Sequence, residues 1–417
     1  MDNICELGNG HFSRIVAAKI KNEKCHQIDE DLNGIVALKI YDRNSDIVKA
    51  KAKYIMQEKK VMERLSLCHS ITMSKYFIKL IKTIKDDTSL QFVMTAALGG
   101  NLNRHLQQQV KNNLNCFTPE VSLKYIAEIF SALRFMSKYG CIHRDIKTSN
   151  CLLDHQGHIS LCDFGSGNIL FDIEDYGRII EDKPQNAPRA YTMVGTPHIM
   201  APECFQRTIG HSLNCDWWSA GALLYELVSG VPLLPHLVDS SLESIERKII
   251  LEVKNTKESD NNGDNSNKNI SQDFESKGTF NDTIYNHLSL FLVKFDNSFH
   301  AAFDNLHSTS TMCDSLESKS RVVSRVKKED MQDLICQLMH INPSKRLGVW
   351  RWNDITSHPA FNSCDIDWEA VENGSSAPPR LNFDHRLGAM DILDARTDQE
   401  QKEDQLTEDQ QALFSTF

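Results

Sequence analysis

Cysteine pairs with a recognisable spacing are absent from this 417-residue chain. Its twelve cysteines are scattered, without a C-x-x-C motif and without a spacing typical of metal ligands. A C-x-x-C redox site and a zinc module are therefore not expected. Polar residues follow Met1 directly, so the chain also has no leading apolar segment. We expect reduced thiols and a cytoplasmic location, with the nucleus as the alternative.

Long hydrophobic runs and an excess of positive charge are absent too. The most apolar stretch, 220–238, contains Glu226, Pro232 and Pro235, which a membrane span would not readily accept. We expect no membrane span there, but a buried helix and its exit. The formal net charge is −10, from 46 lysines and arginines against 56 acidic residues. This balance argues against a nucleic-acid partner.

The most informative feature that is present is an Ile-His-Arg-Asp-Ile-Lys-Thr-Ser-Asn run at 142–150, followed by Asp-Phe-Gly at 163–165. Magnesium-assisted phosphoryl transfer needs a carboxylate that orients the attacking hydroxyl, a cation beside the moving phosphoryl group, and oxygen ligands for the metal. These parts are supplied, in that order, by Asp145, by Lys147, and by Asn150 with Asp163. A lone His-Arg-Asp is often a surface salt bridge. At this spacing, which suits a β-hairpin, the two motifs predict a phosphoryl-transfer site that binds Mg²⁺.

This pair of motifs resembles the signature of protein kinases. The resemblance implies ATP as the phosphoryl donor and a nucleotide site upstream. A glycine-rich run at 8–15, with Ser13 in place of a third glycine, would close over the phosphates, and an apolar strand at 36–39 would end on a phosphate-binding lysine. The expected nucleotide-binding residues are Leu7, Gly8, Gly10, Phe12, Ile15, Ala37, Lys39, Glu58, Met94, Thr95, Ala97 and Leu152.

A helix is predicted over 47–65, and two of its glutamates are candidates for a pair with Lys39. Glu58 lies nineteen residues past the lysine, the interval usual in the kinases that the chain resembles, whereas Glu63 is interpreted as a solvated charge. Making and breaking such a pair couples the position of the helix to the geometry of the phosphates. We therefore choose Glu58.

The resemblance also assigns the segment 163–203 as an activation segment. Thr196 is expected among the catalytic residues. Thr192, four residues earlier, is expected to carry an activating phosphate, and Arg144 would form charge-assisted bonds to it. The expected structural residues are Glu203 with Arg346 as its partner, and Asp216 at the start of a buried helix.

Together these motifs predict an α+β, bilobal protein-kinase fold. The small lobe, rich in β-strands with one key helix, is expected over 1–94, and the large, mostly helical lobe over 95–361. Helical periodicity over 121–139 and 214–230 marks the large lobe, which carries a low-complexity insertion at about 255–320. Inside the insertion, 284–303 is amphipathic and either docks on the large lobe or a partner, or packs beneath its own insertion. Residues 362–417 form a C-terminal tail.

The chain resembles the AGC group of serine/threonine kinases over nearly all its length. The motifs specific to that group are Lys-Arg-Leu-Gly at 345–348, His-Pro-Ala-Phe at 358–361, Ile-Asp-Trp at 366–368 and Pro-Pro-Arg-Leu at 378–381. Phe-Ser at 12–13, Arg-Ala-Tyr-Thr-Met-Val-Gly-Thr at 189–196, Tyr-Glu-Leu-Val-Ser-Gly-Val-Pro at 225–232, and the interval from 378–381 to Leu-Gly-Ala-Met at 387–390 carry a further likeness. Through them the chain is most similar, within the group, to the phosphoinositide-dependent protein kinases, which activate other AGC members. The second choice is the cyclic-nucleotide-dependent kinases. The latter read arginines before the phosphorylation site through acidic residues. Here Asn101 and Ser149 replace two of them, and Glu226 remains.

The chain ends in a Phe-x-x-Phe motif formed by Phe414 and Phe417. By resemblance to AGC kinases, these rings would enter a pocket beside the helix that carries Glu58, lined by Ile47, by Leu80 or Ile84, and by Leu90. The alternative is a free tail, with the pocket left open to recruit hydrophobic motifs of substrate kinases.

The leading functional hypothesis is an active ATP-dependent serine/threonine kinase in intracellular signalling, acting on protein substrates, with other AGC kinases as candidates. One alternative is a pseudokinase or scaffold that binds nucleotide and partners without turnover. In another alternative, the insertion is an interaction module and catalysis is secondary. An active kinase is distinguished from a pseudokinase by four residues, all of which are present: Lys39, Asp145, Asn150 and Asp163. We expect a monomer, without room for a lipid-binding domain after residue 391.

Overall fold

The computed structural model describes residues 2–9, 12–19, 35–66, 73–111, 116–181, 187–205, 210–234, 238 and 325–379. Several predicted features lie outside these residues. They are Gly10, the insertion at 255–320, and the tail beyond residue 379 with Phe414 and Phe417.

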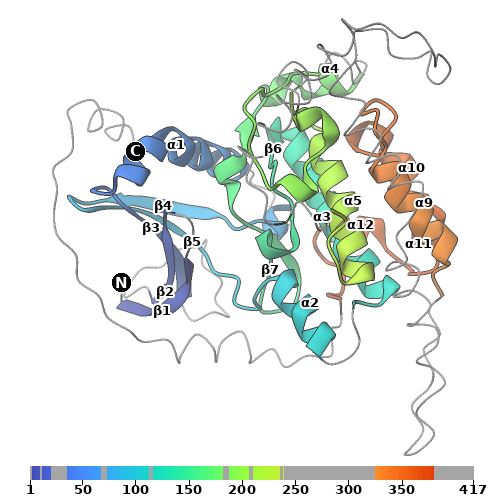
Figure 1. The fold of residues 1–417 in the computed structure, drawn as a ribbon, viewed down its shortest axis with the longest axis horizontal. Coiled ribbons are helices and arrows are strands. Elements are labelled where there is room, and N and C mark those ends of the chain that lie inside the picture. The colour runs from blue at the N-terminus through green and yellow to red at the C-terminus, as the bar shows by residue number, and fades with distance from the viewer. Residues whose placement is uncertain are drawn as a thin grey trace, which may run out of the picture.

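The small lobe is built on one five-stranded sheet in the order β1-β2-β3-β5-β4, with every neighbouring pair antiparallel. Its strands are β1 (Asp2–Asn9), β2 (Arg14–Lys19), β3 (Ile35–Asp42), β4 (Leu80–Lys85) and β5 (Ser89–Thr95). The long helix α1 (Asp46–Ser66) lies beside this sheet (Figure 1). The helix predicted over 47–65 is thus present.

Strand β3 sends alternate side chains to opposite faces of the sheet, because successive residues of a strand alternate. Val36, Leu38 and Ile40 belong to one hydrophobic cluster of the small lobe. Ala37 and Tyr41 belong to the main core instead, which also contains buried residues of α1. Lys39 lies between Ala37 and Tyr41 in this alternation. The phosphate-binding lysine is therefore directed towards α1 and the main core.

Helix α1 buries a stripe of side chains at helical spacing. The apolar members of the stripe are Val48, Ala52, Ile55, Val61, Met62 and Leu65. Glu58 lies among them and is only 2% exposed. A carboxylate in such a position needs hydrogen-bond partners, because burying an unpaired charge is costly.

The large lobe is mostly helical and lies beside the small lobe (Figure 1). Its longer helices are α2 (Leu102–Lys111), α3 (Pro119–Lys138), α5 (Cys215–Ser229) and α9 (Lys328–Leu338). Thr118 caps α3 by accepting a hydrogen bond from the Val121 amide, and Pro119 occupies the first turn. Gly230 ends α5 with a left-handed φ of 78°. Both helices agree with the predicted spans to within two residues.

The start of the C-terminal tail packs against the large lobe. In the short helix α12 (Trp368–Glu372), the Glu372 carboxylate accepts a hydrogen bond from the Arg134 guanidinium of α3 at 2.5 Å. The Tyr76 hydroxyl donates to the Val371 carbonyl at 2.8 Å. The tail up to residue 379 therefore bridges α3 and the segment that precedes β4.

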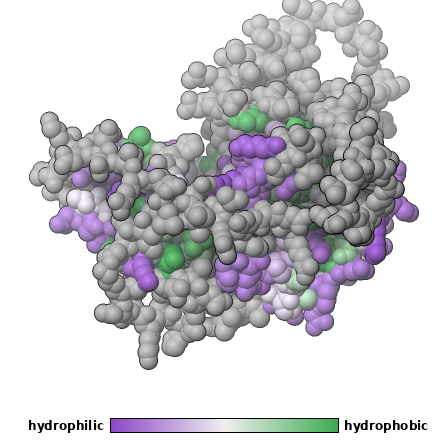
Figure 2. Space-filling view, turned by 90° about the horizontal axis from the view of Figure 1, so that it is seen from below, coloured by the Kyte–Doolittle hydropathy of each residue, from purple (hydrophilic) through white to green (hydrophobic). Residues whose placement is uncertain are grey.

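On the face shown in Figure 2, the described surface is mainly hydrophilic, and hydrophobic residues form small separate patches. Among the described residues, the large hydrophobic side chains that are exposed are Ile47, Ile173, Tyr191, Val231 and Val238. None of the described helices has the length and apolar character needed to cross a membrane.

Candidate active site

A short β-hairpin brings the two sequence motifs together. Strand β7 (Cys151–Leu153) pairs antiparallel with β8 (Ile159–Leu161). The Cys162 amide then donates to the Asn150 carbonyl at 3.0 Å. Asp163, directly after Cys162, is thus returned to the side of Asn150, as the spacing predicted.

The Asp145 carboxylate is the centre of a compact polar cluster. Its Oδ1 accepts a hydrogen bond from the Thr196 hydroxyl at 2.5 Å, and its Oδ2 lies 2.9 Å from the Lys147 ammonium. Lys147 also donates to the Thr196 hydroxyl oxygen at 2.7 Å. The three side chains hold one another in a triangle, so the carboxylate has a fixed orientation.

Asn150 is fixed to the same aspartate. Its amide nitrogen donates to the Asp145 backbone carbonyl at 2.9 Å and to Oδ2 of Asp145 at 3.0 Å. With the nitrogen engaged on that side, the amide oxygen of Asn150 is directed the other way. It is a suitable oxygen ligand for a hard divalent cation.

Asp163 presents an ionised carboxylate. Its Oδ1 lies 3.1 Å from the Lys39 ammonium, and its side chain is 51% exposed. The charge of Lys39 outweighs the effect of burial and lowers the pKa of Asp163 to about 2. Asp163 therefore stays negatively charged at neutral pH, which is the state that binds a metal ion.

Lys39 joins the helix α1 to the Asp-Phe-Gly turn. Its ammonium lies 2.6 Å from Oε1 of Glu58 and 3.1 Å from Oδ1 of Asp163. Burial by itself would lower the pKa of Lys39, but the neighbouring Glu58, Tyr41 and Asp163 raise it well above its ordinary value. The lysine is therefore a cation, and the predicted pairing with Glu58 is formed.

The loop that carries Asp145 is stabilised by the buried carboxylate of Asp216. The carboxylate oxygens of Asp216 accept hydrogen bonds from the amides of His143 and Arg144, each at 2.7 Å. Arg144 has a left-handed φ of 66°, which is uncommon for a residue with a side chain. Two charge-assisted bonds to consecutive amides stabilise this turn.

Arg144 connects the catalytic loop to the activation segment. Its Nε donates to the Ser166 carbonyl at 2.5 Å, and its Nη1 donates to the Thr192 carbonyl at 3.3 Å. The Thr192 side chain itself is exposed. The structure thus joins Arg144 to the backbone of Thr192 and leaves the hydroxyl accessible.

Gly195 allows the activation segment to approach the catalytic loop. It has a φ of 114°, and a Cβ there would lie 2.4 Å from the Arg144 carbonyl oxygen. Any larger residue would therefore clash with backbone. The close approach sets the position of Thr196 against Asp145.

The described residues that were predicted to bind the nucleotide differ in exposure. Ala37 on β3 and Met94 on β5 are buried at 7% and 6% exposure. The half-buried Leu7, Phe12, Ile15, Ala97 and Leu152 pack against the main core, and Gly8 is exposed. The Thr95 amide donates to the Lys79 carbonyl, so of its backbone groups the carbonyl is the one it could offer to adenine.

Glu203 and Arg346 form a buried pair below the activation segment. Nη1 and Nη2 of Arg346 donate to the two carboxylate oxygens of Glu203 at 2.6 and 3.0 Å. Arg346 also donates to the Asn214 carbonyl at 2.9 Å. Both side chains are at most 1% exposed, so the pair anchors the end of the activation segment to the chain between α9 and α10.

Two residues of the predicted tail pocket differ clearly in accessibility. Ile47, in the first turn of α1, is 58% exposed. Leu90 is fully buried and is paired with Tyr41 and Lys85 in the sheet. Ile47 can thus contact a docked side chain in this conformation, whereas Leu90 would need the lobe to open.

The sequence reasoning missed Tyr41, whose hydroxyl donates to Oε2 of Glu58 at 2.7 Å. Alternation along β3 could have indicated that Tyr41 shares a face with Lys39. It could not have indicated which side chain of α1 the hydroxyl meets.

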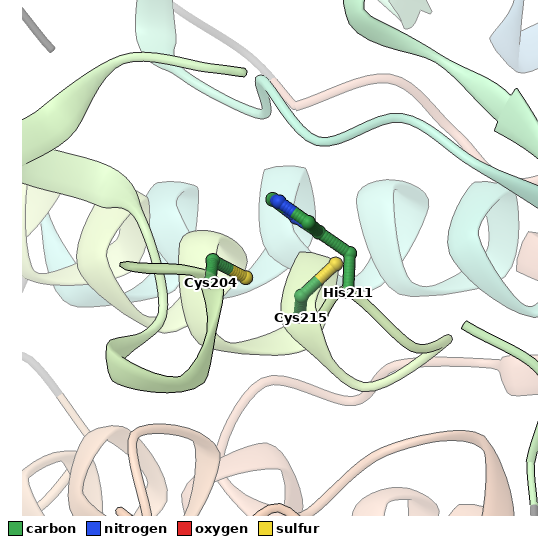
Figure 3. Close-up of side chains that lie close together, drawn as sticks. All are labelled: Cys204, His211 and Cys215. Carbon is green, nitrogen blue, oxygen red and sulfur yellow. The ribbon is translucent and has the colours of Figure 1, made fainter. Parts of the chain in front are cut away.

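A second cluster that the sequence reasoning did not find is formed by Cys204, His211 and Cys215. These buried side chains approach one another beside α5 (Figure 3), and their potential ligand atoms lie within 4.8 Å of one another. A structural zinc site takes four protein ligands. This cluster supplies three, so it does not make up such a site. Burial also raises the pKa of Cys204, which favours the protonated thiol. We interpret the cluster as packing between α5 and the chain that follows the activation segment.

Comparison with known proteins gives a consistent result. Residues 2–361 match the family model described as "Protein kinase domain". The chain is 29% identical over 232 residues to "cAMP-dependent protein kinase, catalytic subunit-like" of Caenorhabditis briggsae. The aligned region covers 56% of this chain and 50% of that protein. It is 30% identical over 228 residues to "Serine/threonine-protein kinase 32B" of Homo sapiens, covering 54% and 47%.

A third relative is "Serine/threonine-protein kinase Sgk1-A" of Xenopus laevis, 30% identical over 226 residues that cover 54% of this chain and 44% of that protein. These relatives are kinases of the AGC group, and the chain spans about half the length of each. The matched domain extends over most of the chain and includes both lobes. With its two-lobed fold, its Lys39–Glu58 pair and its ordered catalytic loop, the chain belongs to the protein kinase family.

Proposed function

We propose that this chain transfers the γ-phosphate of ATP to serine and threonine hydroxyls of protein substrates, with Mg²⁺ as the metal. The observation that carries the proposal is that two sets of contacts are formed in one conformation. Lys39 contacts both Glu58 and Asp163, while Asp145 is oriented by Thr196. Positioning and electrostatic stabilisation supply most of the catalysis of phosphoryl transfer, and these contacts provide both.

In this proposal Asp145 accepts the proton of the attacking hydroxyl, or orients that hydroxyl. A substrate hydroxyl that replaces the Thr196 hydroxyl at Oδ1 of Asp145 would meet an acceptor already held in place. Lys147, at 2.9 Å from the other oxygen, would stabilise the negative charge of the moving phosphoryl group. Lys39 would hold the phosphates that remain on the nucleotide.

Asn150 and Asp163 are the proposed magnesium ligands. The fit rests on an ionised, half-exposed carboxylate and on an amide oxygen directed away from Asp145. Mg²⁺ takes oxygen ligands and is usually held by one or two carboxylates together with substrate phosphates. When bound, the metal would neutralise charge on the phosphates. The two residues fix where that charge is placed.

We also propose Thr192 as a phosphorylation site that regulates the activation segment. Its hydroxyl is exposed, and its carbonyl already accepts a hydrogen bond from Arg144. A phosphate would offer Arg144 a charged partner in place of that neutral carbonyl. Intact mass of bacterially produced protein, wild type against Asp145→Asn, tests self-phosphorylation. We expect phosphate at Thr192 in the wild type alone, and equal amounts in both proteins would contradict it.

For substrates, we propose protein serines and threonines in signalling, with other AGC kinases among them. Support comes from the resemblance to the phosphoinositide-dependent kinases and from Ile47, whose exposed side chain lies at the start of α1. Peptides that carry an AGC activation segment joined to a Phe-x-x-Phe motif should be better substrates than the same segment alone. Ile47→Asp should remove that advantage, and an advantage that persists in the variant would contradict docking beside α1.

The alternative function is a pseudokinase that binds nucleotide and partners without turnover. Purified protein incubated with ATP, Mg²⁺ and a mixed protein substrate separates the two. We expect label from γ-phosphate on serine and threonine, and its loss when EDTA removes the metal. Nucleotide binding, measured by a shift in melting temperature, without any labelled protein would favour the pseudokinase.

A further inference from the structure

Tyr41 is a buried side chain to which no role has been given so far. It follows Lys39 by two residues on β3, so both side chains leave the same face of the strand. Tyr41 is 0% exposed. A tyrosine hydroxyl in that position needs a partner, and this one has a charged partner.

The two oxygens of the Glu58 carboxylate are held by two different donors. Oε1 accepts from the Lys39 ammonium at 2.6 Å, and Oε2 accepts from the Tyr41 hydroxyl at 2.7 Å. Two donors at separate oxygens fix the rotation of the carboxylate as well as its position. With Lys39 alone, the carboxylate could turn about its last bond and keep one contact.

The ring of Tyr41 extends this arrangement to the glycine-rich segment. Its centroid lies 6.1 Å from that of Phe12, with an angle of 26° between the rings. Phe92 of β5 contacts it edge-on at 5.4 Å, and the Lys39 ammonium lies 5.7 Å from its centroid. One side chain thus contacts the glycine-rich segment, the lysine and the glutamate of α1.

We propose that Tyr41 is a positioning residue that fixes Glu58 through its hydroxyl and the glycine-rich segment through its ring, so that Lys39 is held ready for the phosphates of the nucleotide. The inference rests on the proposed ATP-dependent activity. In this arrangement the Lys39–Glu58 pair has its own support inside the small lobe. The pair therefore depends less on contacts between α1 and parts of the molecule outside the small lobe.

The test uses Tyr41→Phe, which removes the hydroxyl and keeps the ring. The matched control is Tyr125→Phe, because Tyr125 is also fully buried and its hydroxyl has no hydrogen-bond partner among the residues that the structure describes. We expect Tyr41→Phe to lower kcat/KM for ATP about tenfold, mainly through KM, as loss of a hydrogen bond to a charged group implies. The control should keep the wild-type value. Equal values for Tyr41→Phe and the wild type would overturn the proposal.

A double-variant cycle with Glu58→Gln separates positioning from general stability. If the hydroxyl acts through the carboxylate, Tyr41→Phe should have almost no further effect on kcat/KM in the Glu58→Gln protein. Additive losses in the cycle would show that Tyr41 only contributes to packing. A second cycle with Phe12→Leu and Tyr41→Leu tests the contact between the two rings. If the rings act through each other, the effects of the two variants on kcat/KM should not be additive.

The nucleotide affinity of each variant, measured by fluorescence titration with an ATP analogue, keeps this inference separate from the proposed function. If the wild type transfers no phosphate, the kinase proposal fails, while a fall in affinity for Tyr41→Phe and not for Tyr125→Phe still supports the positioning role. If transfer is normal in the wild type and both variants bind as it does, the positioning role fails alone.

Discussion

At the scale of single residues, two uncommon backbone conformations occur at the site. Arg144 and Asp163 have φ values of 66° and 62°, and such conformations cost about 1–3 kcal/mol each when a side chain is present. Each is stabilised by charge, because Asp216 binds the Arg144 amide and Lys39 binds the Asp163 carboxylate. The two strained residues thus lie directly beside the catalytic carboxylate of Asp145 and at the proposed metal ligand Asp163.

Glu226 provides a prediction about pH. Burial, partly offset by a hydrogen bond from Thr148, raises its pKa to about 7. The carboxyl group is therefore mostly neutral at pH 6 and mostly negative at pH 8. If Glu226 contacts a basic residue before the phosphorylation site, preference for an arginine-containing peptide over its alanine counterpart should grow as pH rises through 7.

The ratio of kcat/KM for the two peptides, measured from pH 6 to pH 8, checks this prediction. Glu226→Gln should give a ratio that does not change with pH. A ratio that rises equally in the variant would exclude Glu226 as the titrating group.

At the scale of elements, the structure depends on buried contacts between distant segments. Arg346 precedes α10 (Trp352–Thr356), and Glu203 lies in the 3-10 turn Pro202–Phe205. Removal of one partner of a buried ion pair leaves the other charge without compensation, at a cost of about 3–5 kcal/mol. We expect Arg346→Leu to lower the melting temperature by about 4–7 °C.

The control for that variant is Arg351→Ala. Arg351 pairs with Asp354 on the surface, where the side chains are 39% and 54% exposed. Exposed pairs contribute about 0–1 kcal/mol, so the melting temperature should change by only about 1 °C or less. Similar shifts in both variants would contradict the role given to the buried pair.

Much of the site could be predicted at this scale, because motif spacing fixes which residues a hairpin or a helix brings together. The β7–β8 hairpin and the Lys39–Glu58 contact are examples. The contact of Tyr41 with Glu58 could not be predicted, since alternation gives the face of a strand and not the atom opposite. Arg144 likewise meets the Thr192 carbonyl rather than its side chain, a distinction that only backbone geometry makes.

At the scale of the whole molecule, the described tail links the two lobes. Tyr76 and Lys75, in the 3-10 turn before β4, donate to the carbonyls of Val371 and Gly374 at 2.8 Å each. The remaining tail lies outside the described residues, so docking of its last phenylalanines stays a prediction. Burial of two such rings would contribute about 1.5–3 kcal/mol each before ordering costs.

Removal of residues 414–417 tests the tail prediction. Docking on the chain's own small lobe predicts lower basal activity, and an added Phe-x-x-Phe peptide should restore it. Ile47→Asp should resemble the truncation and should not respond to the peptide. Unchanged activity and melting temperature in the truncated protein would show that the tail does not dock there.

The ordered Asp145 cluster is the part of the molecule on which the proposed phosphoryl transfer depends. Transfer from ATP to a protein substrate, measured in parallel with nucleotide affinity for the wild type and Asp145→Asn, tests it most directly. Asp87→Asn is the matched control, because Asp87 is exposed in the turn between β4 and β5. We expect Asp145→Asn to lower turnover by about two to four orders of magnitude with nucleotide affinity unchanged. Near-normal turnover in Asp145→Asn would contradict it.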